Sequence, residues 1–438
     1  MADYKMSGLD FKMKKYSISA LLTALALAGS VYGETMDRPS GIKIGQRMTL
    51  RPYVSVAATY DSNVGARNGR RSVGQKEEDD VIWSVNPGLT LEYSAETWSL
   101  NLGGYYTYHA YCDDHDNLGV TEGNNHSYGQ DLRFNWSNNQ GNDHGWTLIL
   151  FESFRQITMA DDLSAADGSN YNADRRQFQF AGALKHQFNN YVHGDINTSY
   201  YWLDYNGVGN GKHASLYGWQ RWTVGSEFGY APTKWTDFLI SVNYQGYDQD
   251  NTRHAPKGSR YDLSNQSDGF SVQAGFGSSA TERITYRLLA GWSRFEYADV
   301  SSDNGFVYTA SGHWKIGETW QMMLLGSSYY QPSERDYGTS TRVDSLGWGL
   351  VKMLVRGKLR ASLDLSYRHE RHDYVYDAGD YDIDFLTGRF GLDYMLNRFA
   401  ALFANFEYQK ATSDEASSSN YNYDYDRWRV TTGIRFTY

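Results

Sequence analysis

The chain has 438 residues, with 41 Lys and Arg against 51 Asp and Glu. Without residues 1–33, which contain four Lys and two Asp, 37 basic and 49 acidic groups remain, a net charge of −12. This balance excludes nucleic acid as the main partner, because phosphate binding needs a basic surface. The single cysteine, Cys112, excludes a disulfide framework, a Cys-rich zinc site and a lipoprotein anchor. A mean hydropathy of −0.63 excludes a polytopic helical membrane protein, whereas 16% aromatic residues suit a β-barrel.

The N-terminal region predicts an export signal. Lys14 and Lys15 form a short positive segment, residues 18–28 are apolar, and Val31 and Gly33 suit a cleavage site before Glu34. The apolar run is too short to remain as a transmembrane helix. We therefore assign residues 13–33 to a signal peptide, 1–12 to an upstream extension, 34–49 to a periplasmic segment and 50–438 to a barrel.

From Leu50 onward the apolar residues recur with a period of two, which indicates strands with one apolar and one polar face. The segment 359–368 is typical, because leucines at 359, 363 and 365 alternate with charged and small polar residues. The apolar faces tend to begin or end in Trp, Tyr or Phe, as expected at the two membrane interfaces. A soluble barrel could not bury the charges of the polar faces, but a water-filled lumen can hold them.

Connections between the expected strands alternate between short and long. Short turns such as 94–96 and 356–357 alternate with long polar segments such as 62–78, 112–125, 298–303 and 371–380. Strict alternation requires an even number of strands that run up and down. The sequence therefore predicts an all-β, transmembrane antiparallel up-and-down β-barrel of about 18 strands, with 16 as the alternative.

The final strand carries an assembly signal. Its apolar face ends the chain on an aromatic residue, and it consists of Trp428, Val430, Ile434, Phe436 and Tyr438. This pattern resembles the C-terminal signal of bacterial outer-membrane barrels, which the barrel-assembly machinery reads. Trp98, Trp235 and Trp320 each follow a short turn, where an aromatic ring suits the inner interface.

The first strand runs into Tyr60-Asp61-Ser62-Asn63-Val64. An opening strand that ends in this way, followed by amphipathic hairpins, resembles the beta-barrel porin type 2 family. The resemblance implies an outer-membrane barrel, with members similar to barrels linked to exopolysaccharide loci. It implies no catalytic or binding residues.

Charged residues on the polar faces are the candidate functional residues, because they are expected to face the lumen. Both signs are present, so they either set ion selectivity or pair with one another across the lumen. They are Glu92, Asp131, Arg133, Arg221, Glu227, Arg287, Arg360, Asp364, Arg368, Arg389, Asp393, Glu407, Arg429 and Arg435.

Other clusters have weaker chemical patterns. The segment 112–116 combines Cys, His and three Asp, but its oxygen ligands lack the spacing of a cation site, which favours a solvated loop. Segments 373–384 and 421–426 alternate acids with Tyr, which is typical of strands that continue above the membrane. His369 and His372 lack the spacing of a zinc protease.

The sequence thus predicts a channel of the bacterial outer membrane that passes small solutes or saccharides, with a link to exopolysaccharide export. An adhesin or structural barrel is the first alternative, and a barrel enzyme the second. We expect no enzymatic activity, no cofactor and no metal. The expected partners are outer-membrane lipids, lipopolysaccharide, the assembly machinery and a polysaccharide, while the sequence leaves the oligomeric state open.

Overall fold

A computed structural model describes residues 41–64, 79–112, 125–138, 144–157, 174–206, 219–233, 235–249, 266–278, 283–297, 301–332, 338–374, 381–414 and 424–438. The expected extension and signal peptide, residues 1–33, lie outside these ranges. Every regular element in the described part of the chain is a strand. No helix among these residues is long and apolar enough to cross a membrane.

The strands follow the chain in an order that matches the period-two segments. Their bounds are β1 Ile42–Ile44, β2 Met48–Asp61, β3 Asp80–Ser94, β4 Trp98–Tyr111, β5 Asn125–Ser137, β6 Gly145–Ile157, β7 Asp174–Gln187, β8 Val192–Asn206, β9 Trp219–Thr233, β10 Thr236–Gln249, β11 Gln266–Ser278, β12 Ile284–Tyr297, β13 Ser301–Ile316, β14 Trp320–Pro332, β15 Gly338–Val355, β16 Leu359–Tyr374, β17 Tyr381–Asn397, β18 Ala400–Ser413 and β19 Tyr425–Thr437.

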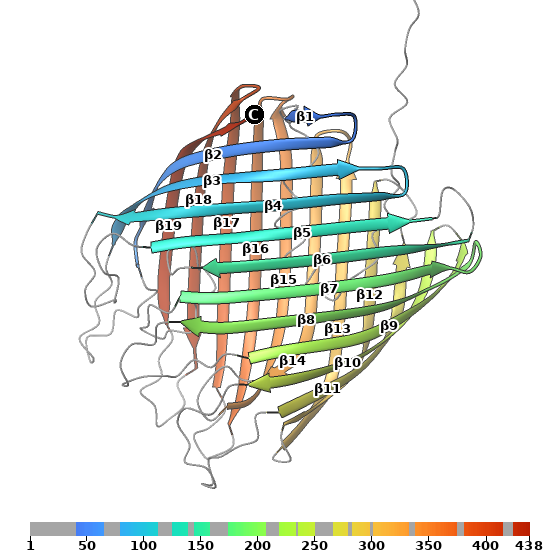
Figure 1. Cartoon of the computed structure of the whole chain (residues 1–438). Helices are drawn as coiled ribbons and strands as arrows, with labels where there is room; N and C mark the ends of the chain where they lie inside the picture. Colours follow the sequence, from blue (N-terminus) through green and yellow to red (C-terminus); the bar gives the residue numbers. More distant parts are fainter. Residues whose placement is uncertain are drawn as a thin grey trace, which may run out of the picture.

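Strands β2 to β19 form one closed antiparallel barrel (Figure 1). Each strand pairs with its neighbours in the chain, and β19 closes the barrel by pairing with β2. The three-residue β1 adds to β2 through Ile42 opposite Leu50. The prediction of an all-β barrel of about 18 strands is therefore confirmed.

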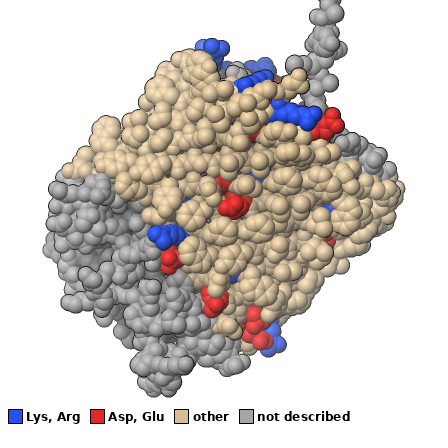
Figure 2. Space-filling model, in the orientation of Figure 1, with Lys and Arg blue, Asp and Glu red and all other residues tan. Residues whose placement is uncertain are grey.

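The strand pairings separate an apolar outer face from a polar inner face. Opposite residues across a pair share a face, so Leu363 lies beside Leu350 and Phe390 on the outside, while Ser362 lies beside Gly391 on the inside. Outer residues such as Trp83 and Leu365 are exposed, as a lipid-facing wall requires. Figure 2 shows one side of this wall, where charges are sparse over the strands.

Aromatic pairs lie near both ends of the outer wall. At the end with the short turns, Trp98 stacks on Tyr93 with ring centroids 4.5 Å apart, and Lys352 lies 4.1 Å from the centre of Trp320. At the other end, Tyr60 contacts Trp428 at 4.8 Å. Two aromatic girdles with an apolar band between them are the usual pattern of outer-membrane barrels.

The strand bounds depart from expectation at two places. The link between β12 and β13, expected to be long, spans only residues 298–300, because β13 already begins at Ser301. The first barrel strand begins at Met48, two residues before the boundary expected at residue 50. Short turns at the opposite end use Gly317 and Gly357 with φ of 68°, a conformation that glycine adopts without strain.

The motif that follows β2 fastens the first strand to the last. Asp61 is fully buried, and it accepts hydrogen bonds from Arg427 at 2.6 Å and Arg429 at 2.7 Å. Ser62 and Trp428 exchange hydrogen bonds of 3.0 Å and 2.8 Å through the Ser62 amide and hydroxyl groups. The Asn63 side-chain amide donates to the Asp426 carbonyl oxygen at 3.0 Å. The sequence Asp-Ser-Asn therefore closes the barrel at the end with the long connections.

Candidate pore lining

The inner wall of the barrel has an open part on β16, β17 and β18. Asp364, Ser366, Arg389 and Asn405 alternate with lipid-facing residues on these strands, and all four are exposed. Leu365 and Phe390 mark the lipid-facing side of the same strands, so these four residues point inward. Their exposure therefore means that water reaches the inner face here. A wet, charged inner wall is what an aqueous channel requires.

The inner wall on β8 to β12 is packed instead. Buried inner residues include His193, Asp195, Thr223, Leu239, Ser241, Gln273 and Leu289, all 9% exposed or less. Glycines let these strands approach closely, because a Cβ atom at Gly275 would overlap the Leu288 carbonyl oxygen and one at Gly291 would overlap that of Val272. This part of the wall therefore offers little surface to a solute.

An aromatic cluster occupies the packed wall near the end with the long connections. It joins inner-face residues of β8, β9, β10, β12 and β13 with one residue of β14. Its members are Leu203, Trp219, Tyr247, Phe295, Tyr297, Val307 and Tyr330, with Tyr201 against it. The guanidinium carbon of Arg221 lies 5.8 Å from the ring centres of Tyr201 and Trp219. We expected polar residues on this face, and that expectation is wrong here.

Several of the charged residues proposed from the sequence are paired along the wall. Arg287 donates to Glu227, although two strands lie between β9 and β12. Arg389 donates to Glu407 at 2.8 Å, and Arg429 to Asp61 at 2.7 Å. Further ion pairs join neighbouring positions of the inner face. Asp131 lies 3.6 Å from Arg155, Arg368 lies 3.1 Å from Glu370, and Arg51 pairs with Glu92.

The remaining proposed charges lie among rings or beside other charges. Arg435 lies 5.4 Å from the Phe403 ring centre, and Arg368 also lies 4.4 Å from that of Phe385. Asp393 stands opposite the buried Arg360 in the ladder between β16 and β17. No ion pair involves Arg133 or Arg221 within the part of the chain that the structure describes. Whether these charges set selectivity stays a prediction.

Sequence reasoning missed other titratable groups on the packed wall. His193 and Asp237 form a buried contact of 2.7 Å, and Lys185 lies in the electrostatic field of Asp195 and Glu227. The period-two pattern could have shown that these residues face inward. It could not have shown that they are buried, since that depends on how strands from different hairpins pack.

The weaker sequence clusters do not form sites in the described residues. His369 faces outward, where it contacts Asp384 at 2.9 Å, while His372 faces inward and lies 3.2 Å from Glu370. Of the segment 112–116, only the exposed Cys112 lies within the described residues. Residues 77–78 and 375–380 also lie outside them. Across the described ranges, no three His, Cys, Asp or Glu residues come together as metal ligands would.

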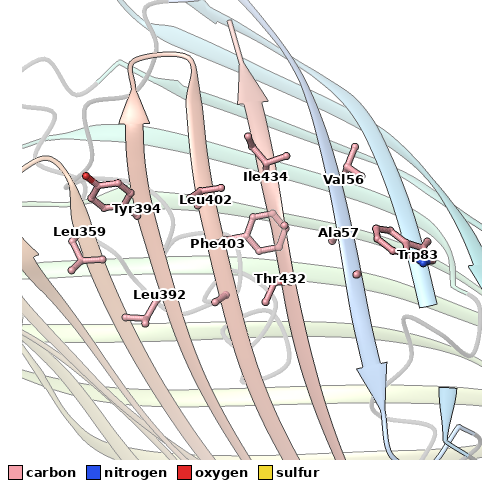
Figure 3. Close-up of a pocket in the computed structure, with 13 residues that line it drawn as sticks. Val56, Ala57, Trp83, Leu359, Leu392, Tyr394, Leu402, Phe403, Thr432 and Ile434 are labelled. Atoms are coloured by element: carbon pink, nitrogen blue, oxygen red, sulfur yellow. The ribbon is translucent and has the colours of Figure 1, made fainter. Parts of the chain in front are cut away.

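The outer wall over the barrel closure carries an apolar groove (Figure 3). Small side chains at Ala58, Ala404 and Thr432 lie between larger ones such as Trp83 and Leu402. Because Trp83, Leu402 and Thr432 lie on the lipid-facing side of their strands, this groove belongs to the membrane surface and not to the lumen.

A closed barrel with an apolar outer wall, two aromatic girdles and a charged inner wall is an outer-membrane β-barrel. Residues 240–438 match the family model described as "Putative beta-barrel porin 2", which confirms the resemblance drawn from the sequence. The match covers β11 to β19 and most of β10, so it does not include the motif after β2. The protein is a porin-like barrel of the bacterial outer membrane.

Known structures resemble the chain at low identity. They include the siderophore receptor PirA from Acinetobacter baumannii, with 8% identity, a TM-score of 0.42 and coverage of 91% of this chain and 81% of that chain. The outer membrane protein opdK from Pseudomonas aeruginosa has 10% identity, a TM-score of 0.43 and coverage of 89% and 99%. The FrpB iron transporter from Neisseria meningitidis has 10% identity, a TM-score of 0.44 and coverage of 93% of this chain and 83% of that chain. No curated protein matches the chain.

Proposed function

We propose that the protein is a non-catalytic outer-membrane channel that passes small hydrophilic solutes or saccharides. The observation that carries this proposal is the exposed inner wall of β16 to β18, where Asp364 and Arg389 present opposite charges to water inside an apolar barrel. Solvated charges of both signs favour passage of polar molecules over apolar ones. The match to a porin family supports the same class.

We also propose that the channel is linked to exopolysaccharide export. It rests on the resemblance of the first strand and on nothing in the inner wall. Partners would be lipopolysaccharide and outer-membrane lipids around the outer wall, and the assembly machinery at the last strand. The exposed aromatic residues Trp428 and Phe436 on β19, and Tyr438 directly after it, suit that recognition.

Conductance of the purified barrel in a planar bilayer tests the channel. We expect ohmic current from single insertions, and entry of neutral sugars in a liposome-swelling assay. A heat-dependent shift in SDS gels serves as the control for folding, because a folded barrel migrates differently before boiling. A folded protein that carries no current and passes no sugar would contradict the proposal and favour an adhesin or structural barrel.

A further inference from the structure

The seam between β13 and β14 is open at the end with the long connections. The two strands pair from Ile316 opposite Trp320 to Thr309 opposite Ser327, and the pairing stops there. Both strands continue: Ser301–Tyr308 pairs only with β12, and Ser328–Pro332 only with β15. Two strand edges are thus left without a ladder partner among the described residues, although unpaired edges are costly in a membrane barrel.

Beyond this point β14 and β15 fold to the inside of the wall. Both approach β12 directly, past β13. Tyr330 has outer-face parity on β14, since it follows Met322, Leu324 and Gly326, yet it is only 5% exposed. Its ring packs with Tyr247 and Phe295, which lie on the inner face of β10 and β12. The outer face of β14 therefore packs against the inner face of the nearby strands β10 and β12.

Polar contacts hold the same arrangement. The Gln245 amide donates to the Tyr330 carbonyl oxygen at 3.3 Å, and the Tyr247 hydroxyl group donates to it at 3.4 Å. On β15, the Ser340 hydroxyl group, which also has outer-face parity, donates to Asp303 on the inner face of β13. We refer to this end of the β14–β15 pair, residues 328–332 with 340–344, as the flap.

The sequence also suits a second position of the flap. If the ladder of β13 and β14 continued in its present register, Phe306 would lie opposite Tyr330 and Val307 opposite Tyr329. Tyr330 would then face lipid beside Phe306, which is 55% exposed, and Tyr308, where an aromatic ring suits the outer girdle. Both free edges would gain hydrogen bonds, whereas the inner position gains the aromatic cluster instead.

We propose that the flap is a gate: folded inward it narrows the channel, and zipped onto β13 it opens the channel. This inference rests on the channel function proposed above. The inward position shields the inner face of β10 and β12 near the end with the long connections, because Tyr330 packs against Tyr247 and Phe295. Moving Tyr330 to the girdle would uncover that wall and leave the remaining pairings of β14 with β15 unchanged.

A pair of cysteines can trap the zipped position. Phe306→Cys with Tyr330→Cys, in a Cys112→Ser background, places two thiol groups on directly opposite residues only when the ladder continues. Opposite residues in a ladder are close enough for a disulfide bond. Ala310→Cys with Gly326→Cys is the matched control, because these residues on the same strands are already opposite each other.

We expect both pairs to cross-link under oxidation. The oxidised F306C/Y330C barrel should carry a higher single-channel current than the wild type. Dithiothreitol should lower it to an intermediate level, because the reduced pair still lacks the Tyr330 ring, while the current of A310C/G326C stays constant. Failure of F306C/Y330C to cross-link where the control does, or cross-linking without a change in current, would overturn the gate. Absence of current in every variant would instead count against the channel itself.

A single substitution covers the case in which F306C/Y330C does not fold. Tyr330→Ala removes the ring that holds the flap in the cluster, so the mean current should rise relative to the wild type. Phe270→Ala on β11 is the control, since Phe270 is 47% exposed on the outer face and lies outside the cluster. Equal currents in the wild type and in Tyr330→Ala would contradict the proposal.

Discussion

The inner wall of β8 to β12 and that of β16 to β18 differ although both alternate with lipid-facing residues in the same way. On the first, Glu227 is 4% exposed and forms an ion pair with Arg287, although two strands lie between them. On the second, Arg389 pairs with Glu407 on the adjacent strand and keeps a side chain that is 53% exposed. A side chain that points into a barrel is therefore not always in contact with water.

The difference follows from how closely each wall is packed. On β8 to β13 glycines such as Gly275 and Gly291 allow the strands to crowd one another. At the end with the long connections, Tyr330 of the flap also packs against this wall. On β16 to β18 the inner face is buried toward its two ends, at residues such as Arg360 and Phe385, whereas Asp364 and Ser366 between them are exposed. The open wall is therefore the better place to look for the path of a solute.

The largest expected effect comes from breaking one ion pair in each wall. Glu227→Gln leaves Arg287 buried without its partner, which costs about 3–5 kcal/mol in a buried pair. Glu407→Gln breaks the more exposed pair with Arg389, for which about 0.2–1 kcal/mol is typical. The temperature at which the folded form disappears in SDS gels measures both, and equal shifts would abolish the distinction between the two walls.

Introducing arginine at three positions tests the faces next. At mid-membrane on the lipid side an arginine costs about 2–4 kcal/mol, so Leu363→Arg should sharply reduce the folded fraction. Ser362→Arg, on the open inner wall, should fold normally. Ser241→Arg, on the packed inner wall where Ser241 is 5% exposed, should fold poorly. If Ser241→Arg and Ser362→Arg fold equally well, the packed wall has space that the structure does not show.

These faces could be predicted from the sequence, and their packing could not. Alternation placed Leu363 outside and Ser362 inside because a strand turns successive side chains to opposite sides. The same rule assigns Tyr330 to the outside, where a tyrosine suits a girdle, yet its ring lies inside the barrel. That outcome depends on the early end of the β13–β14 ladder, which alternation along a single strand does not reveal.

The closure of the barrel illustrates the same limit. The segment 60–64 was recognisable as a family-like motif, and the last strand as an assembly signal. Their meeting through Asp61, Arg427 and Arg429 could not be read from the sequence, because 366 residues separate Asp61 from Arg427. Charged residues near strand ends are common, and only the closed fold selects which of them pair.

A smaller effect is expected on ion selectivity. Asp364→Asn removes a negative charge from the open wall, so permeation should shift toward anions. The change should stay below about fivefold, since exposed charges in water contribute about 0.2–1 kcal/mol. Asp195→Asn, on the packed wall, should leave the reversal potential unchanged while it lowers stability. The opposite result would place the solute path along β8 rather than β16.

The smallest effect concerns the dependence of selectivity on salt. The expected outer loops are acidic at residues 77–80, 113–116 and 161–162, so their field should favour cations at the mouth. The screening length falls from about 10 Å at 0.1 M salt to about 3 Å at 1 M, so a preference that arises in the loops should fade over this range. Charges that line a narrow path, such as Asp364 and Arg389, act within a few ångströms and are screened much less.

Reversal potentials measured in KCl gradients at both salt levels distinguish the two sources. A cation preference that persists at 1 M, and that Asp364→Asn removes, would assign selectivity to the open wall and not to the loops.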